Sequence, residues 1–128
     1  MLTFALSLLL AAAPDVSATY RIEAPRVVKV KKGAPARATV AVVPSEGAHV
    51  SPDAPVSLNV HSGPALKLSK EKLGRADAKE TPAKGVEFAV PFTATASDKL
   101  EGTLTFFICT DKLCERQKRE IALAVEVE

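Results

Sequence analysis

Short segments of alternating apolar and polar residues, separated by turn residues, predict an all-β fold for this chain of 128 residues. A period of two places one set of side chains in a core and the other in solvent, as in a half-buried strand. No segment keeps the 3.6-residue periodicity of a helix. Six or seven such strands in roughly 110 residues fit an immunoglobulin-like two-sheet sandwich, and a small barrel is the alternative.

The first residues predict an export signal. Leu2–Ala13 is an apolar run that is too short to span a bilayer comfortably. Pro14 ends the run, and Val16-Ser17-Ala18 offers the small side chains that a signal peptidase recognises. A buried N-terminal helix is the alternative. We therefore expect residues 1–18 to be a signal peptide and residues 19–128 a single domain, periplasmic or secreted, with no membrane span after processing.

The charge balance indicates no nucleic-acid partner. The chain holds 17 basic and 15 acidic residues, and residues 1–18 carry only Asp15, so the mature charge is 17 − 14 = +3. So mild an excess, without aromatic residues among the basic ones, is not the pattern of a nucleic-acid surface. In an oxidising compartment, two cysteines usually form a disulfide.

Two strands are expected before residue 44. Val27–Lys31 alternates β-branched residues with lysines, which is typical of an edge strand whose charges discourage pairing with a second molecule. Gly33 and Pro35 make a turn, and Ala36–Val43 is the next strand. We interpret the basic residues here as a solvated edge, with a docking surface for anions as the alternative: Arg21, Arg26, Lys29, Lys31, Lys32 and Arg37.

The middle of the chain alternates loops and strands. Pro44–Pro55 contains two prolines, a glycine and two serines, so we expect a loop. Val56–His61 is expected to be a half-buried strand, and Ala65–Leu68 a short one. The charged segment 69–85 is too long for a plain connection and predicts a surface excursion with one helical turn.

The last third carries most of the expected core. Val86–Phe92 reads as a strand, in which Pro91 predicts an edge position or a bulge. Ala96–Gly102 should turn the chain into the strand Thr103–Ile108, and Ile121–Glu128 should be the last strand. The expected core residues are Phe88, Val90, Phe92, Leu104, Phe106, Ile108, Leu123 and Val125.

Cys109 and Cys114 are the only cysteines, and they are the candidate site. A disulfide that closes these six residues would remove only ~2 kcal/mol of unfolded-chain entropy, so the pair is poorly placed for stability alone. A short, exposed disulfide at a strand end is instead well placed for attack by another thiolate. The spacing differs from Cys-x-x-Cys, and no helix N-terminus is evident that would activate a thiol. The residues alone leave a structural staple and a redox pair equally open.

The metal-ligand inventory consists of these two cysteines with His49 and His61. Two sulfurs and two imidazoles satisfy zinc in number, but the histidines do not have zinc-finger spacing. A blue-copper site would need a histidine after the cysteine and usually an axial methionine, and Met1 is the only methionine. We expect no metal and no cofactor. The chain also lacks a nucleophile-elbow motif and a glycine-rich phosphate loop.

Three motifs resemble the N-terminal domain of the DsbD-type thiol:disulfide interchange proteins. They are Gly47-Ala48-His49-Val50-Ser51-Pro52-Asp53-Ala54-Pro55, Val90-Pro91-Phe92, and Phe107-Ile108-Cys109 with Cys114. The resemblance covers roughly residues 25–127 and implies an exported immunoglobulin-like domain. It implies that Cys109 and Cys114 are a redox pair that passes reducing equivalents between a membrane-embedded electron donor and periplasmic thiol proteins. Four residues separate them here, one fewer than in the best-known members.

The sequence therefore predicts an exported thiol-disulfide exchange module, with an activity like that of a protein-disulfide reductase. Its partners would be thiol and disulfide proteins of the periplasm. The alternative is a non-enzymatic periplasmic binding or assembly domain with a structural disulfide. A metal carrier is a distant third class.

Overall fold

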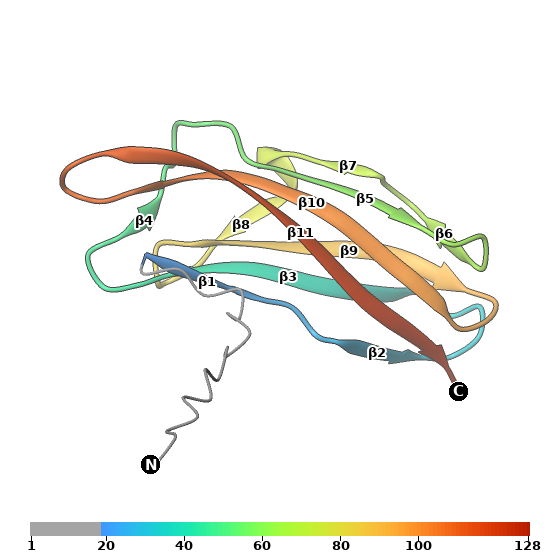
Figure 1. The fold of residues 1–128 in the computed structure, drawn as a ribbon. Coiled ribbons are helices and arrows are strands. Elements are labelled where there is room, and N and C mark those ends of the chain that lie inside the picture. The colour runs from blue at the N-terminus through green and yellow to red at the C-terminus, as the bar shows by residue number, and fades with distance from the viewer. Residues whose placement is uncertain (1–18) are drawn as a thin grey trace, which may run out of the picture.

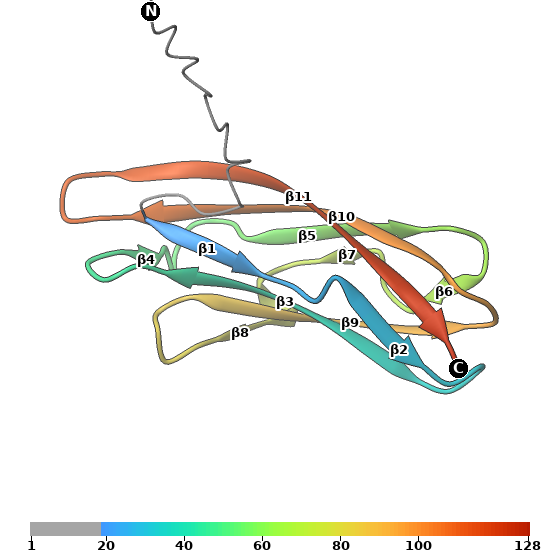
Figure 2. The same cartoon turned by 60° about the horizontal axis from the view of Figure 1, so that its bottom comes forward.

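The computed structural model describes residues 19–128, so the predicted signal peptide lies outside the described residues. Two β-sheets pack face to face (Figure 1, Figure 2), which confirms the predicted all-β sandwich. The five-stranded sheet contains β1 (Tyr20–Glu23), β3 (Ala36–Pro44), β9 (Val86–Ala94), β6 (Leu66–Leu68) and β8 (Ala78–Glu80). The six-stranded sheet contains β2 (Val27–Val30), β11 (Cys114–Val127), β10 (Asp98–Cys109), β5 (Ser57–Ser62), β7 (Lys72–Leu73) and β4 (His49–Val50). No helix within residues 19–128 has the length and apolar character needed to cross a membrane.

The β10–β11 hairpin is the longest feature of the fold. Its register runs through twelve pairs, from Asp98 opposite Val125 to Cys109 opposite Cys114. The chain does turn at Ala96, but the predicted turn Ala96–Gly102 is too long, because the chain is already paired from Asp98 onward. The last strand also begins earlier than the predicted Ile121, because β11 starts at Cys114. Most residues from Glu115 to Glu120 are exposed, so no apolar alternation marks them as strand.

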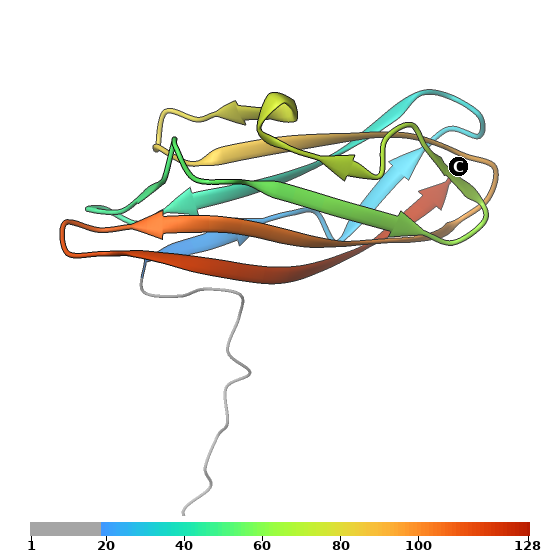
Figure 3. The ribbon, with the colours of Figure 1, turned by 90° about the horizontal axis from the view of Figure 1, so that it is seen from above.

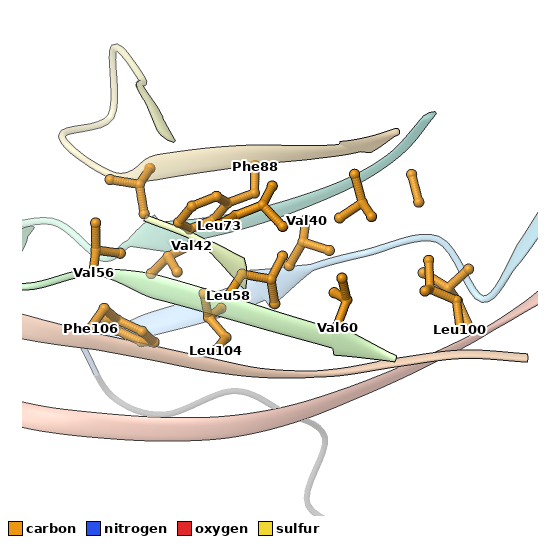
Figure 4. Packing of buried hydrophobic residues seen from close by; sticks show 14 of the residues in the cluster. Val40, Val42, Val56, Leu58, Val60, Leu73, Phe88, Leu100, Leu104 and Phe106 are labelled. Atoms are coloured by element: carbon orange, nitrogen blue, oxygen red, sulfur yellow. The ribbon is translucent and has the colours of Figure 1, made fainter. Parts of the chain in front are cut away.

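All eight predicted core residues are buried, with exposed fractions of 4% or less. Figure 4 shows Phe88 of β9 facing Phe106 and Leu104 of β10 across the space between the sheets. Tyr20 joins them as a core residue that the sequence analysis missed. Its ring meets the Phe106 ring edge-on, with centroids 5.0 Å apart and an interplanar angle of 88°. The Tyr20 hydroxyl donates to Gln117 Oε1 at 2.9 Å and accepts from Arg119 Nε at 2.6 Å, which ties β1 to β11.

Pro91 lies in β9, an interior strand, but at this residue β9 has a register partner on one side only, because β6 pairs with residues 92–94 and β8 with residues 86–88. The predicted edge position is therefore wrong for the strand and correct for Pro91 itself, and there is no bulge in the register with β3. On one side Pro91 faces Arg37 in a continuous register with β3. On the other side the Ser69 N–H donates to the Pro91 carbonyl at 3.2 Å, just beyond the last β6 pair, Leu68 with Phe92. The N–H and C=O of one strand residue point to the same side, so the missing donor of proline falls where β6 has ended. The sheet therefore loses no ladder hydrogen bond.

The charged segment 69–85 crosses from one sheet to the other, as a surface excursion with one helical turn. It forms β7, a 3₁₀ turn at Arg75–Asp77, and β8. Asp77 accepts hydrogen bonds from Lys70 Nζ at 2.8 Å and from the Gly74 N–H at 2.9 Å. The Lys70 bond, followed by the Gly74 bond, lowers the pKa of Asp77. These contacts therefore stabilise the fold above the ordinary aspartate pKa, and the stabilisation is lost as the pH falls through the lowered value.

β2 is an edge strand, as its alternating lysines predicted. It pairs in parallel with β11, and only over Ala124–Val127. Within the described residues, no strand pairs with this side of β11 between residues 114 and 123.

Gly85 allows the five-stranded sheet to close tightly beside β3. A Cβ at this position would lie 2.0 Å from the Val42 carbonyl oxygen, which is backbone and cannot turn away. Gly85→Ala is therefore expected to destabilise the fold by about 1–3 kcal/mol, measured by urea unfolding. Gly74→Ala is the control, because a Cβ there meets nothing within 4 Å and φ is −121°. That change should stay within about 0.5 kcal/mol. Equal losses in both variants would contradict the close approach.

Candidate functional site at the tip of the last hairpin

Cys109 and Cys114 form a disulfide that joins the last residue of β10 to the first of β11. Their Cα atoms are 4.0 Å apart, and they are direct register partners. The four-residue loop Thr110–Leu113 connects them, with the Thr110 N–H donating to the Leu113 carbonyl at 2.9 Å. This tip lies at the same end of the sandwich as β4 (Figure 1), and Figure 3 shows the orange and red strands of the hairpin running side by side toward it. The long hairpin thus places both sulfurs together.

The two cysteines differ in exposure. Cys109 is only 2% exposed, whereas Cys114 is exposed. The cause is strand order: Cys109 has a neighbour on each side, His49 of β4 and Cys114 of β11. Cys114 lies on β11, and no described strand pairs with the other side of β11 between residues 114 and 123. The expectation of an exposed disulfide is therefore correct for Cys114 and wrong for Cys109.

His49 is the residue that the structure adds to this pair. The prediction of a loop is wrong at this residue, because His49 belongs to the two-residue strand β4 and lies opposite Cys109. Directly opposed residues of antiparallel strands project to the same face, with Cβ atoms about 4.5–5.5 Å apart. His49, Cys109 and Cys114 therefore form a row across three strands. No local sequence signal identifies this row, because the two strands that set it are 60 residues apart, from 49 to 109.

β4 is held in place by contacts from both sheets. The Val50 N–H donates to the Lys84 carbonyl at 2.9 Å, and the Ser51 N–H donates to the Phe107 carbonyl at 2.9 Å. The Arg75 guanidinium donates to the Ser51 carbonyl at 3.0 Å and also to the Ala54 carbonyl. These bonds fix the segment that carries His49 against β10. Arg75 thus holds the segment after β4 in position, a role that the sequence of the charged segment 69–85 does not predict.

The four candidate metal ligands are not brought together. His61 is an exposed residue opposite Glu101, with 3.0 Å between Nε2 and Oε2. Glu101 is eight residues from Cys109 along β10, so His61 belongs to a different part of the sheet. Both sulfurs are in the disulfide. Among residues 19–128, no group of three His, Cys, Asp or Glu side chains could hold a metal ion.

Comparison with known proteins identifies structures with a similar fold, but it does not assign this chain to a protein family. No family model and no curated protein matches the chain. A chain from the complex of zinc 2-glycoprotein and prolactin-inducible protein of human seminal plasma is similar, with a TM-score of 0.54 and 15% identity over 84% of this chain and 93% of that one. Murine CRIg gives a TM-score of 0.45 and 13% identity over 85% of this chain and 98% of that one. At such identities the likeness extends only to the fold, an immunoglobulin-like sandwich.

Proposed function

We propose that this domain is an exported thiol-disulfide exchange module in which Cys109 and Cys114 pass reducing equivalents to or from periplasmic thiol proteins. The observation that carries the proposal is the position of the disulfide. It joins two residues that are already register partners at the tip of a twelve-pair hairpin. Closing so short a loop contributes only ~2 kcal/mol on the chain-entropy model, less than a bridge between distant residues would. The resemblance to the DsbD-type N-terminal domain supports the same function.

The difference in exposure between the two cysteines supports an order for the exchange. A partner thiolate attacks Sγ of Cys114, because Cys114 is exposed and Cys109 is buried. A bond forms between the partner's sulfur and Cys114, the Cys109–Cys114 bond breaks, and the electron pair leaves on the Cys109 sulfur. A second thiol of the partner then attacks the partner's sulfur in the mixed disulfide. This step forms a disulfide within the partner and releases Cys114 as a thiol. The partner is thereby oxidised by two electrons, and this domain is reduced.

The reverse reaction uses the same two cysteines. The Cys114 thiolate attacks a partner disulfide, and Cys109 resolves the mixed disulfide by attacking Cys114. His49 lies opposite Cys109 in the register, so its imidazole is the neighbouring group that can hydrogen-bond the sulfur left as a thiolate. In this row, Cys114 is the sulfur that is attacked, Cys109 is the leaving thiolate, and His49 is the side chain next to that thiolate.

A second candidate function is a binding or assembly domain with a structural disulfide. It is favoured by Leu113, which is 53% exposed at the hairpin tip directly beside Cys114. In this function the disulfide would fix the tip so that Leu113 is presented to a partner.

The reduction potential of the cysteine pair separates the two functions. The protein is equilibrated in glutathione and dithiothreitol buffers, and the reduced fraction is measured by thiol alkylation and mass spectrometry. We expect a potential between about −270 and −180 mV, the range of thioredoxin, glutaredoxin and disulfide isomerase. A value below about −300 mV would instead indicate a structural disulfide and contradict exchange. The control is the double variant Cys109→Ser/Cys114→Ser, which should lose no more than ~2 kcal/mol in urea unfolding.

A further inference from the structure

The outward face of the last hairpin forms a ladder of side chains that starts at the disulfide. Phe106 and Ile108 point into the core, so the alternate residues of β10 and their partners on β11 face outward. Successive outward pairs are about 6.8 Å apart along antiparallel strands. Moving away from the tip, these pairs are Cys109 with Cys114, Phe107 with Arg116, and Thr105 with Lys118. Along the strand, the backbone of Arg116 therefore lies about 7 Å from that of Cys114, and the backbone of Lys118 about 14 Å.

The same face contains a hollow of ≈ 620 Å³ beside the disulfide. Arg116, Lys118, Phe107 and Thr105 contribute to its lining, together with Ser57 and Asn59 of β5. Of the described residues that line it, only Arg116 and Lys118 carry charge. Neither makes a side-chain hydrogen bond or an ion pair with any residue of 19–128. The hollow thus contains two positively charged side chains without a described partner, next to hydroxyl and amide groups that can donate hydrogen bonds.

The sign of the charge reverses further along the ladder. The next outward pair is Thr103 with Glu120, and after it comes Glu101, which is bound to His61. The outward positions of the hairpin therefore carry Arg116 and Lys118 next to the disulfide and carboxylates at the far end. Of the exposed acidic residues near Cys114, Glu115 is opposite Ile108 and so projects to the other face, and Asp111 of the tip loop is offset by its neighbour Lys112. A partner with carboxylates near its reactive sulfur is attracted in one orientation and repelled in the opposite one.

We propose that this hollow is the docking surface for the redox partner, and that it selects partners whose reactive cysteine is flanked by carboxylates. Arg116 and Lys118 bind the carboxylates, Phe107 gives an apolar contact, and the docked partner brings its sulfur to the exposed Cys114. The docking surface acts through the cysteine pair and so rests on the proposed exchange function.

The test uses two synthetic peptides with one cysteine each, followed in one by four glutamates and in the other by four glutamines. The measurement is the second-order rate at which each peptide reduces the Cys109–Cys114 disulfide at low salt. We expect Arg116→Glu/Lys118→Glu to lower the ratio of the glutamate-peptide rate to the glutamine-peptide rate by about tenfold, since local fields change association rates by 10-fold or more. Comparing ratios between protein variants cancels the different reactivities of the two peptide thiols. The effect should fade near 1 M salt, where the Debye length is about 3 Å.

The matched control is Lys67→Glu/Lys79→Glu, which makes the same charge change at exposed positions of the five-stranded sheet. This variant should keep the wild-type ratio. Urea unfolding of both variants shows whether either change acts through stability. If the Arg116/Lys118 variant matches the control, docking is overturned while exchange stands. If neither peptide nor dithiothreitol reduces the disulfide of the folded protein, both proposals fail.

Discussion

Replacing Phe106 with alanine is expected to cost on the order of 3–5 kcal/mol of folding free energy. The Phe106 ring has 0% exposure and packs edge-on against the ring of Tyr20. Truncation would leave a cavity between the sheets and also remove an aromatic pair, which is worth about 0.5–1.5 kcal/mol beyond its buried area. It would also loosen the support for the Tyr20 hydroxyl, which holds β1 to Gln117 and Arg119. The core therefore loses packing and an inter-sheet tie in one change.

Urea unfolding with a fixed m-value measures this loss. Phe107→Ala is the control, because Phe107 is the same residue type one position along but points outward and is half-buried. Its loss should be well below that of Phe106→Ala. A loss below about 1 kcal/mol for Phe106→Ala would mean that the ring does not lie in the core, since surface changes are typically that small.

Replacing Cys109 with serine is expected to trap a partner on Cys114, because the exposed sulfur can still attack while the resolving sulfur is missing. Replacing Cys114 with serine leaves only a residue that is 2% exposed, so it should trap little. With a peptide disulfide as the probe, the mixed-disulfide adduct should form at least about tenfold faster on Cys109→Ser, as followed by mass spectrometry.

The same two variants can be tested against exported proteins on non-reducing gels. A band of higher mass that disappears with dithiothreitol is expected for Cys109→Ser. Equal adduct formation by both single variants would contradict the assignment of Cys114 as the attacked sulfur. If neither variant captures a thiol protein and the double variant keeps cellular function, the disulfide is a local staple on a binding domain.

The apolar alternation in the sequence predicted the centre of the core. Phe88, Val90 and Phe92 alternate with exposed or half-buried residues, and the same rule identified Leu104 and Phe106. The rule failed where a strand shows no apolar face. Residues 115–120 form strand with most side chains exposed, and Tyr20 sits in a β1 of only four residues, too short to show a period. The position of Pro91 depends on where β6 ends, which is a property of the neighbouring strand.

The candidate site was predictable only in part. Cys109 and Cys114 stand out as the only cysteines, and their closeness in sequence brings them together in any hairpin. The burial of Cys109 and the place of His49 depend on the pairing of β4 with β10, across 60 residues. Likewise, Arg116 and Lys118 flank the disulfide only because β11 begins at Cys114 and continues the pairing.

The parallel pairing of β2 with the end of β11 also limits the order in which the sheet can form during synthesis. Val27 pairs with Ala124, 97 residues further along the chain. Contacts of such long sequence separation form late, because the loop-closure entropy must be overcome first. The other neighbours of the early strands, such as Val42 with Val86, become available sooner. A chain that emerges from its N-terminal side therefore cannot complete the six-stranded sheet until residue 124 has emerged. Both cysteines have emerged by then, so they are available to each other before β2 has its partner residues.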